Sequence, residues 1–385
     1  MKKIIILSLL VIAGILFFAQ IKRGFLSILI LADSVRPPGK ALMGKFIAGP
    51  LVEKVTVPGR GGLIAADLYS PRGKGGYFPL LLVHGVNPDG KDDEQLVLLA
   101  KDLSRAGFLV LVPDFVGMKS LRPRISDAED VLRCFLYLKG REHARGRGGG
   151  MLGISYGAGP VLLAAADPRV RDKVSVVATL GGYYDLRNVM LFATTGAFEY
   201  GGHRGLIRPD SSLRWMLAYR NLDLLRSRPD RETLRKIIEK RNRYELAGAG
   251  ALAKSLGDEG RALYAFLVNA DPERFYPLYE NLPVSVREYA YQLSPARAMR
   301  YSTSYFIIAH GTDDYSIPYT ESMRLADAVG DAGRVHLALL PQFMHIEPFD
   351  PSAESSAGDR LKRSVVGGWK LLAAIYDLLE KGEQR

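Results

Sequence analysis

The sequence predicts an α/β fold with a doubly wound, mostly parallel sheet, and two observations carry this prediction. From residue 50 onward, short apolar runs alternate with longer segments of helical periodicity. Strands of a parallel sheet are buried on both faces and therefore read as continuous apolar runs, with helices as their connections. The chain has 385 residues, of which 48% are hydrophobic. That is enough for one large core plus an insertion.

The core elements alternate in a regular order, which is what a doubly wound sheet requires. The pair Ser126 and Glu129 has the spacing of a capping box, which predicts a helix start at residue 127. The expected elements are strands 52–57 and 63–69, strand 79–84, helix 93–105, strand 108–113, helix 127–138, strand 150–154, helix 156–166 and strand 175–180.

The alternation stops after Asp185. Apolar residues in the range 187–301 recur every three to four positions, which indicates amphipathic helices, and no convincing strand is present. We expect a helical cap insertion at 187–301 that covers the mouth of the site. The core then comprises 50–186 and 302–385.

One pentapeptide in the core has the form G-x-S-x-G and is centred on Ser155. It follows a short apolar strand and precedes an Ala- and Leu-rich helix, so Ser155 lies at a sharp strand-to-helix turn. Side chains in place of Gly153 and Gly157 would collide with neighbouring elements, so glycines allow the serine oxygen to project into a site. With 40 glycines in the chain, this pentapeptide alone is a weak signal.

An upstream strand supplies a possible oxyanion site. The run Leu80–Val83 ends in His84 and Gly85, and the following loop could offer the backbone N–H of Val86. The Tyr156 N–H, at the start of the helix, would be the second donor. Histidines at such strand ends usually order their loop, which is the role expected for His84.

Two later strands supply an acid and a base. An apolar strand ends in a turn that contains Asp313 and Asp314, and we favour Asp314 as the acid with Asp313 as the near alternative. Asp185, at the end of an earlier strand, is a rival acid. His345 follows the last strand and is the candidate base by position and by elimination. The other histidines are expected to be structural or solvated: His84, His143, His203, His310 and His336.

The order Ser155, Asp314, His345 resembles that of the α/β-hydrolase superfamily, with motifs matching from about Val52 to about Leu379. The stretch from His310 to Pro318 is similar to the acid-bearing turn of dienelactone-hydrolase-like and lipase-like members. That likeness selects Asp314. The segment 113–120 resembles the P-D-x-x-G-x-G-x-S loop of the family, but it is one residue shorter and carries Met118 near the second glycine position.

The resemblance implies a serine hydrolase that cleaves carboxylic esters through an acyl-enzyme. His345 would take the Ser155 proton, Asp314 would orient the imidazole, and the Val86 and Tyr156 amides would bind the oxyanion. This chemistry needs no metal or organic cofactor, and the only cysteine, Cys134, lies on an apolar helix face. An acyltransferase or thioesterase with the same triad is an alternative, and a non-catalytic lipid-binding protein is another. A peptidase is disfavoured because no propeller-like β repeats precede the core.

The N-terminus begins with Lys2 and Lys3, followed by the apolar run 4–21 and then by Lys22 and Arg23. That length predicts one uncleaved transmembrane anchor over 1–32, whose second apolar stretch, 25–32, would lie at the membrane interface. A linker over 33–49 would join it to the core. Basic residues on both flanks leave open which side of the membrane carries the enzyme.

The chain has a net charge of +11, and its cap is rich in basic residues. Together with the apolar N-terminus, this charge suggests anionic lipid headgroups nearby. No nucleic-acid recognition motif accompanies the charge, so nucleic acid is not an expected partner. The expected ligand is a small or lipid-like ester, and no obligate protein partner is predicted.

Overall fold

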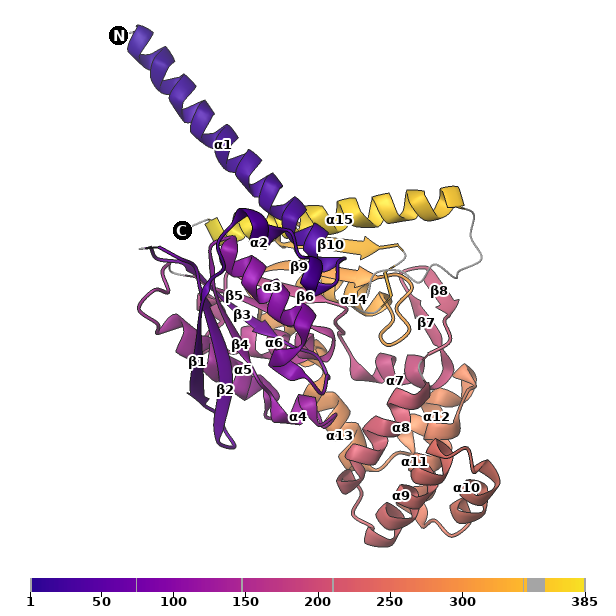
Figure 1. Cartoon of the computed structure of the whole chain (residues 1–385). Helices are drawn as coiled ribbons and strands as arrows, with labels where there is room; N and C mark the ends of the chain where they lie inside the picture. The colour runs from indigo at the N-terminus through magenta and orange to yellow at the C-terminus, as the bar shows by residue number, and fades with distance from the viewer. Residues whose placement is uncertain are drawn as a thin grey trace.

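The computed structural model describes residues 2–73, 75–146, 148–209, 211–341, 343–344 and 357–383. An eight-stranded sheet forms the centre of the molecule (Figure 1). Its strands lie in the order β1-β2-β4-β3-β5-β6-β9-β10, and all pairings are parallel except those of β2 with β1 and β4. The strands are β1 (Leu51–Pro58), β2 (Leu63–Ser70), β3 (Phe78–Val83), β4 (Phe108–Pro113), β5 (Gly150–Ile154), β6 (Val176–Leu180), β9 (Tyr305–Gly311) and β10 (Val335–Leu340).

The two faces of the sheet bury alternate residues of the same strands. In β3, Leu81 and Val83 pack into one core, whereas Leu80 and Leu82 pack into the other. Because helices cover both faces, all four side chains are fully buried and the strand sequence is apolar throughout. The predicted doubly wound α/β fold is therefore confirmed.

The helices divide between the two faces. One face packs against α5 (Asp127–Lys139), α6 (Ala158–Ala165) and α14 (Thr320–Val329). The other packs against α3 (Glu94–Arg105), α15 (Ala357–Glu383) and the C-terminal part of α1 (Lys2–Ser34). The short helices α2 (Met43–Phe46) and α4 (Val116–Lys119) lie in connecting segments.

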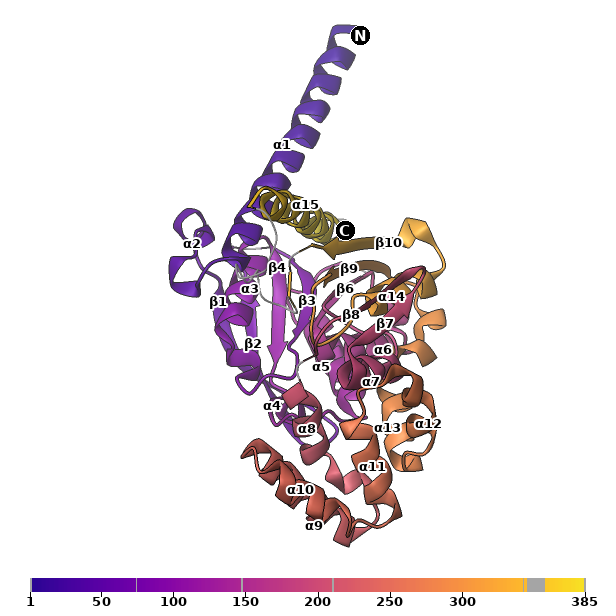
Figure 2. The same cartoon turned by 90° about the vertical axis from the view of Figure 1, so that its right-hand side faces the viewer.

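Helix α1 packs on the core through the stretch that was expected to lie at a membrane interface. Leu26, Leu29 and Ile30 are buried beside α15 and α3. Arg23 forms ion pairs at 2.7 Å with both Glu380 and Glu383 of α15. The N-terminal part of the helix projects away from the body in both views (Figures 1 and 2).

The predicted transmembrane helix and the single-pass membrane localisation are wrong. No helix in the described part of the chain combines the length and the apolar content that crossing a membrane requires. Part of the physical reason lies in the range 25–32, where Leu26, Leu29 and Ile30 pack α1 onto the core. The segment expected to be a linker, 33–49, contains α2, whose Met43 is fully buried.

The segment 187–301, which was expected to be a cap, is largely helical and has its own hydrophobic core. Trp215, Leu234, Ile237, Phe266 and Phe275 are central to this core. Figure 1 shows these helices grouped at one end of the molecule, away from α1 and α15. The cap helices are α7 (Leu186–Thr195), α8 (Ser211–Arg220), α9 (Arg228–Asn242), α10 (Leu246–Ala253), α11 (Asp258–Val268), α12 (Phe275–Glu280) and α13 (Val284–Leu293).

The expectation that this segment contains no strand is wrong. A hairpin of β7 (Ala197–Tyr200) and β8 (His203–Leu206) follows α7. Gly201 and Gly202 form its turn with φ of 58° and 81°, values that suit a tight two-residue hairpin turn.

Candidate active site

Ser155 occupies a strained turn at the end of the central strand β5. The strand ends at Ile154, a 3-10 helix begins at Ser155, and α6 continues from Ala158. The backbone φ of Ser155 is 52°, a left-handed value that is uncommon for a residue with a side chain. Such strain persists only where the surrounding structure enforces it, and it is concentrated at functional sites.

The two flanking glycines are required by close backbone contacts. A β-carbon on Gly153 would lie 2.6 Å from the Ala158 α-carbon, and one on Gly157 would lie 2.3 Å from the His84 carbonyl oxygen. Both contacts are with backbone atoms, which cannot move aside as a flexible side chain could. Glycine at these two positions therefore has a steric origin.

The loop after β3 lies directly beside the serine. A β-carbon on Gly85 would stand 3.0 Å from the Ser155 β-carbon and 3.5 Å from its Oγ. The predicted oxyanion donor Val86 follows, and its N–H has no hydrogen-bond acceptor among the residues that the structure describes. The Tyr156 N–H lies in the first turn of the 3-10 helix, where amides have no acceptor within the helix.

His84 orders this loop. Its Nε2 accepts a hydrogen bond from the Phe115 N–H at 3.1 Å, which places the ring proton on Nδ1, where it donates to the Gly85 carbonyl at 2.7 Å. Burial lowers the pKa of His84 and so favours the neutral ring. The structure gives His84 the loop-ordering role expected from its position.

Asp314 lies in the turn after β9 and is fully buried, whereas its neighbour Asp313 is exposed. The Oδ1 of Asp314 accepts the backbone N–H groups of Ser316 at 2.7 Å and Ile317 at 2.9 Å. Two such donors hold the carboxylate in one orientation.

His310 is the nearest imidazole to Asp314 among the described residues. Its Nε2 lies 3.2 Å from Asp314 Oδ2 and 3.0 Å from the Ile317 carbonyl oxygen, while its Nδ1 lies 2.6 Å from Ser322 Oγ. Both ring nitrogens are therefore engaged in holding the acid turn onto α14. This arrangement corresponds to a structural histidine.

The rival acid Asp185 is used as a helix cap. Its Oδ1 accepts the Arg187 N–H at 2.9 Å at the start of α7, and Ser294 Oγ lies 3.4 Å from the same oxygen. Its own N–H donates to Glu321 Oε2 at 2.7 Å. The side chain of Asp185 therefore caps the start of helix α7.

His345 lies outside the described residues. The chain that leads to it leaves β10 at Leu340 and passes beside the acid-bearing segment. A β-carbon on Gly311 would lie only 2.0 Å from the Phe343 carbonyl oxygen. The segment just before His345 therefore runs alongside the end of β9, the strand that precedes Asp314.

The segment 113–120, which differs from the family loop at Met118, is partly helical in the structure. The segment forms α4, a single helical turn, and Met118 is fully buried in the core. The preceding Asp114 pairs with Lys119 at 3.1 Å. The segment is therefore a short helix held by an ion pair.

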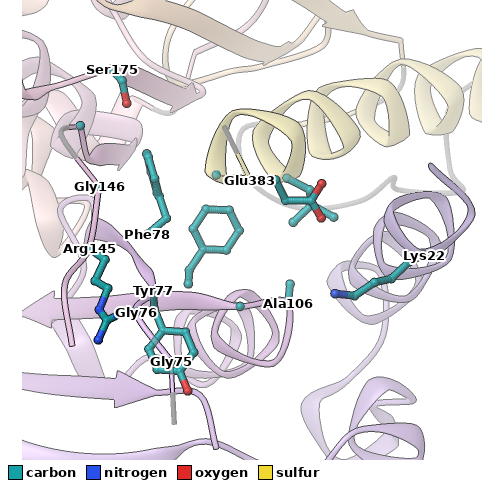
Figure 3. A pocket seen from close by; sticks show the side chains of 15 residues that line it. Lys22, Gly75, Gly76, Tyr77, Phe78, Ala106, Arg145, Gly146, Ser175 and Glu383 are labelled. Atoms are coloured by element: carbon teal, nitrogen blue, oxygen red, sulfur yellow. The ribbon is translucent and has the colours of Figure 1, made fainter. Parts of the chain in front are cut away.

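Two of the cavities in the described part of the chain are not lined by Ser155. The first, of about 710 Å³, is lined by Phe78, Phe108 and Ser175, residues at or before the first positions of β3, β4 and β6 (Figure 3). It therefore lies at the edge of the sheet opposite the one where β5 ends at Ser155. The second, of about 730 Å³, lies between the β7–β8 hairpin and the start of α14, with Glu321 and Arg324 in its lining.

Two buried carboxyl groups, Glu321 and Asp127, were not predicted from the sequence. Glu321 on α14 accepts the N–H groups of Tyr184 and Asp185, and burial raises its pKa to about 7. Asp127 accepts the hydroxyl of Tyr156, and burial raises its pKa to about 6. Helical periodicity could have revealed Glu321, since it lies four residues before Leu325 on the apolar face of α14.

No protein-family model and no curated protein matches the sequence. Among solved structures, a proposed hydrolase from Legionella pneumophila is 13% identical, with a TM-score of 0.52, over 87% of this chain and 91% of that one. This likeness, together with the strand order, shows that the chain has the α/β-hydrolase fold.

Two peptidase structures are more distant. An acylaminoacyl peptidase from Pyrococcus horikoshii is 13% identical, with a TM-score of 0.48, over 88% of this chain and 42% of that one. A puromycin-hydrolysing peptidase from Mycobacterium tuberculosis is 14% identical, with a TM-score of 0.49, over 87% of this chain and 39% of that one. The chain thus spans about two fifths of the length of these peptidases.

Proposed function

We propose that this chain is a serine hydrolase that cleaves carboxylic esters. The observation that supports this most strongly is the positive φ of Ser155 at the end of β5, with the backbone of Gly85 packed against it. The α/β-hydrolase fold and the buried, amide-held Asp314 add to this support.

In the proposed mechanism, His345 accepts the proton of Ser155 Oγ as the oxygen attacks the ester carbonyl carbon. The Val86 and Tyr156 N–H groups stabilise the negative charge that develops on the carbonyl oxygen. His345 then protonates the leaving alcohol, and Asp314 holds the imidazole in the required tautomer. Water attacks the resulting acyl-enzyme with His345 again as base, releasing the acid and restoring Ser155.

In this proposal, the segment 187–301 acts as a cap that controls access to the site. Its residue Asp223 pairs with Arg122, and the Tyr289 hydroxyl of α13 donates to the Pro123 carbonyl at 2.7 Å. Both contacts fall on the loop after α4, which follows strand β4 at the same edge of the sheet as Ser155. We therefore propose that the cap limits the size of the acyl group that can reach Ser155.

Steady-state hydrolysis of p-nitrophenyl esters tests the proposal. We expect turnover of acetate, butyrate or octanoate esters by the wild type and loss of that turnover in Ser155→Ala. An N-acylated amino acid p-nitroanilide, assayed in parallel, distinguishes esterase from amidase activity. Preferential cleavage of the anilide would contradict the ester assignment and leave the serine mechanism intact.

Added alcohols and thiols separate hydrolysis from acyl transfer. A hydrolase releases free acid at a rate that a millimolar acceptor leaves unchanged, whereas a transferase forms the new ester or thioester instead. Ester binding without turnover in a folded wild-type protein would favour a non-catalytic binding role and would contradict the proposed function.

A further inference from the structure

The side chain of Tyr156, the residue after Ser155, is held in a buried polar contact. The residue is 8% exposed, and its hydroxyl donates to Asp127 Oδ2 at 3.1 Å. Burial raises the pKa of this phenol well above its ordinary value, so the hydroxyl remains a neutral donor.

Asp127 is a buried carboxyl group to which the proposed reaction assigns no chemical step. It begins α5, is 3% exposed, and its Oδ2 also accepts the Arg124 N–H at 2.9 Å. A carboxylate is costly to bury without partners. Capping a helix does not require a buried carboxyl group, because an exposed residue can do it. The burial of Asp127 against Tyr156 therefore has another explanation.

The ring of Tyr156 packs against the ring of Tyr183. The two rings stack with centroids 6.2 Å apart and planes inclined by 20°. Tyr183 is itself fixed, because its hydroxyl donates to the Leu293 carbonyl at the end of α13 at 3.0 Å. The absence of a side chain at Gly159 makes room for it, since a β-carbon there would lie 2.0 Å from the Tyr183 hydroxyl oxygen.

We propose that Asp127 is a positioning residue for the oxyanion site, which clamps the Tyr156 side chain together with Tyr183 so that the Tyr156 backbone N–H keeps its direction. This inference rests on the proposed function, because it assigns the oxyanion role to that amide. A tyrosine whose hydroxyl is hydrogen-bonded and whose ring is stacked restricts rotation of the backbone at its own residue. Displacement of a positioned group by about 1 Å can cost on the order of 100-fold in rate.

Three substitutions test the clamp. Tyr156→Phe removes the hydroxyl and keeps the ring stack, Asp127→Ala removes the acceptor, and Asp127→Asn keeps an oxygen that can accept from both donors. We expect Tyr156→Phe and Asp127→Ala to lower kcat on a p-nitrophenyl ester by about 10-fold or more, with KM within about twofold, because the oxyanion contact forms only in the transition state. Asp127→Asn should recover most of the kcat lost in Asp127→Ala.

Tyr77→Phe is the matched control. Its hydroxyl is likewise a hydrogen-bond donor, but its acceptor is the Gly73 carbonyl and it lies at the opposite edge of the sheet. It should leave kcat unchanged. If Asp127→Ala fails to fold, Tyr156→Phe and Asp127→Asn still decide the question.

The outcomes separate this inference from the function on which it rests. A wild-type kcat in folded Tyr156→Phe would overturn the clamp and leave the serine hydrolase intact. An equal loss in kcat for Asp127→Asn and Asp127→Ala would also overturn it, because the acceptor oxygen would then be irrelevant. Absence of Ser155-dependent turnover in the wild type would instead refute the proposed function.

Discussion

Gly85 and Ser155 pack so closely that a β-carbon on the glycine would stand 3.0 Å from the β-carbon of the serine. The Ile154 carbonyl oxygen would lie 3.2 Å from the same added atom. The end of β3 and the turn after β5 are therefore fitted to each other at backbone level. This fit makes the proposed site sensitive to a single methyl group at position 85.

Gly85→Ala should lower kcat on an ester substrate by about 10- to 100-fold, since displacing one oxyanion donor approaches the cost of removing it. Gly61→Ala is the control, because a β-carbon at that position meets nothing within 4 Å. Comparing kcat and the melting temperature of both variants checks the prediction. Full activity in Gly85→Ala would show that the β3 loop has no part in catalysis.

Asp314→Asn should lower kcat by about 10²- to 10⁴-fold in a folded protein, because the amide cannot stabilise the imidazolium that forms at His345. Asp185→Asn should retain near wild-type kcat, since asparagine also caps helices well. Circular dichroism and steady-state kinetics on the two variants check both statements. The assignment of the acid fails if Asp185→Asn abolishes hydrolysis while Asp314→Asn leaves it intact.

Glu321 should make stability depend on pH. Its pKa is raised by burial from 4.5 to about 7, so the folded state binds its proton more tightly than the unfolded state does. The stability from this group is fully present below about pH 4.5 and is lost as pH rises through about 7.

Glu321→Gln should remove part of the loss of stability that occurs as pH rises. Relative to the wild type, the variant should gain on the order of 2 kcal/mol in free energy of unfolding between pH 5 and pH 8. Urea denaturation at several pH values measures this difference. The exposed Glu142→Gln serves as the control, and parallel curves for wild type and Glu321→Gln would show that the buried carboxyl does not titrate as stated.

Leu29→Ala should destabilise the fold by about 2–4 kcal/mol, the range for removing a buried leucine. Leu29 is 5% exposed in the core beside α15, whereas its neighbour Ile28 is 54% exposed. Ile28→Ala should therefore change stability by less than about 0.5 kcal/mol. Equal effects of the two substitutions would contradict the packing of α1 on the core.

The core strands could be predicted closely from the sequence because their signals are local. Strands β4 and β5 begin and end where predicted, since apolar runs bounded by glycine and proline leave little choice of limits. The predicted capping box of Ser126 and Glu129 does not form. Ser126 has helical dihedral angles and makes no side-chain capping hydrogen bond, although the helix begins at Asp127 as predicted.

Long-range packing explains the other differences. The hairpin β7–β8 was missed because its strands have four residues each and carry polar side chains, although the Gly201-Gly202 pair is a recognisable turn signal. Apolar content alone cannot distinguish a stretch that faces lipid from one that packs on a helix such as α15, so the packing of 25–32 could not be predicted. The buried contact of Asp127 could not be predicted from local sequence, because its partner Tyr156 lies 29 residues away.

Intact-mass analysis after exposure to a fluorophosphonate tests the central claim most directly, with Ser155→Ala treated in parallel. The account predicts a single phosphonyl adduct on the wild type and none on the variant, since only an activated Ser155 reacts. A folded wild type without an adduct, or an adduct that persists in Ser155→Ala, would contradict the assignment of Ser155 as the nucleophile.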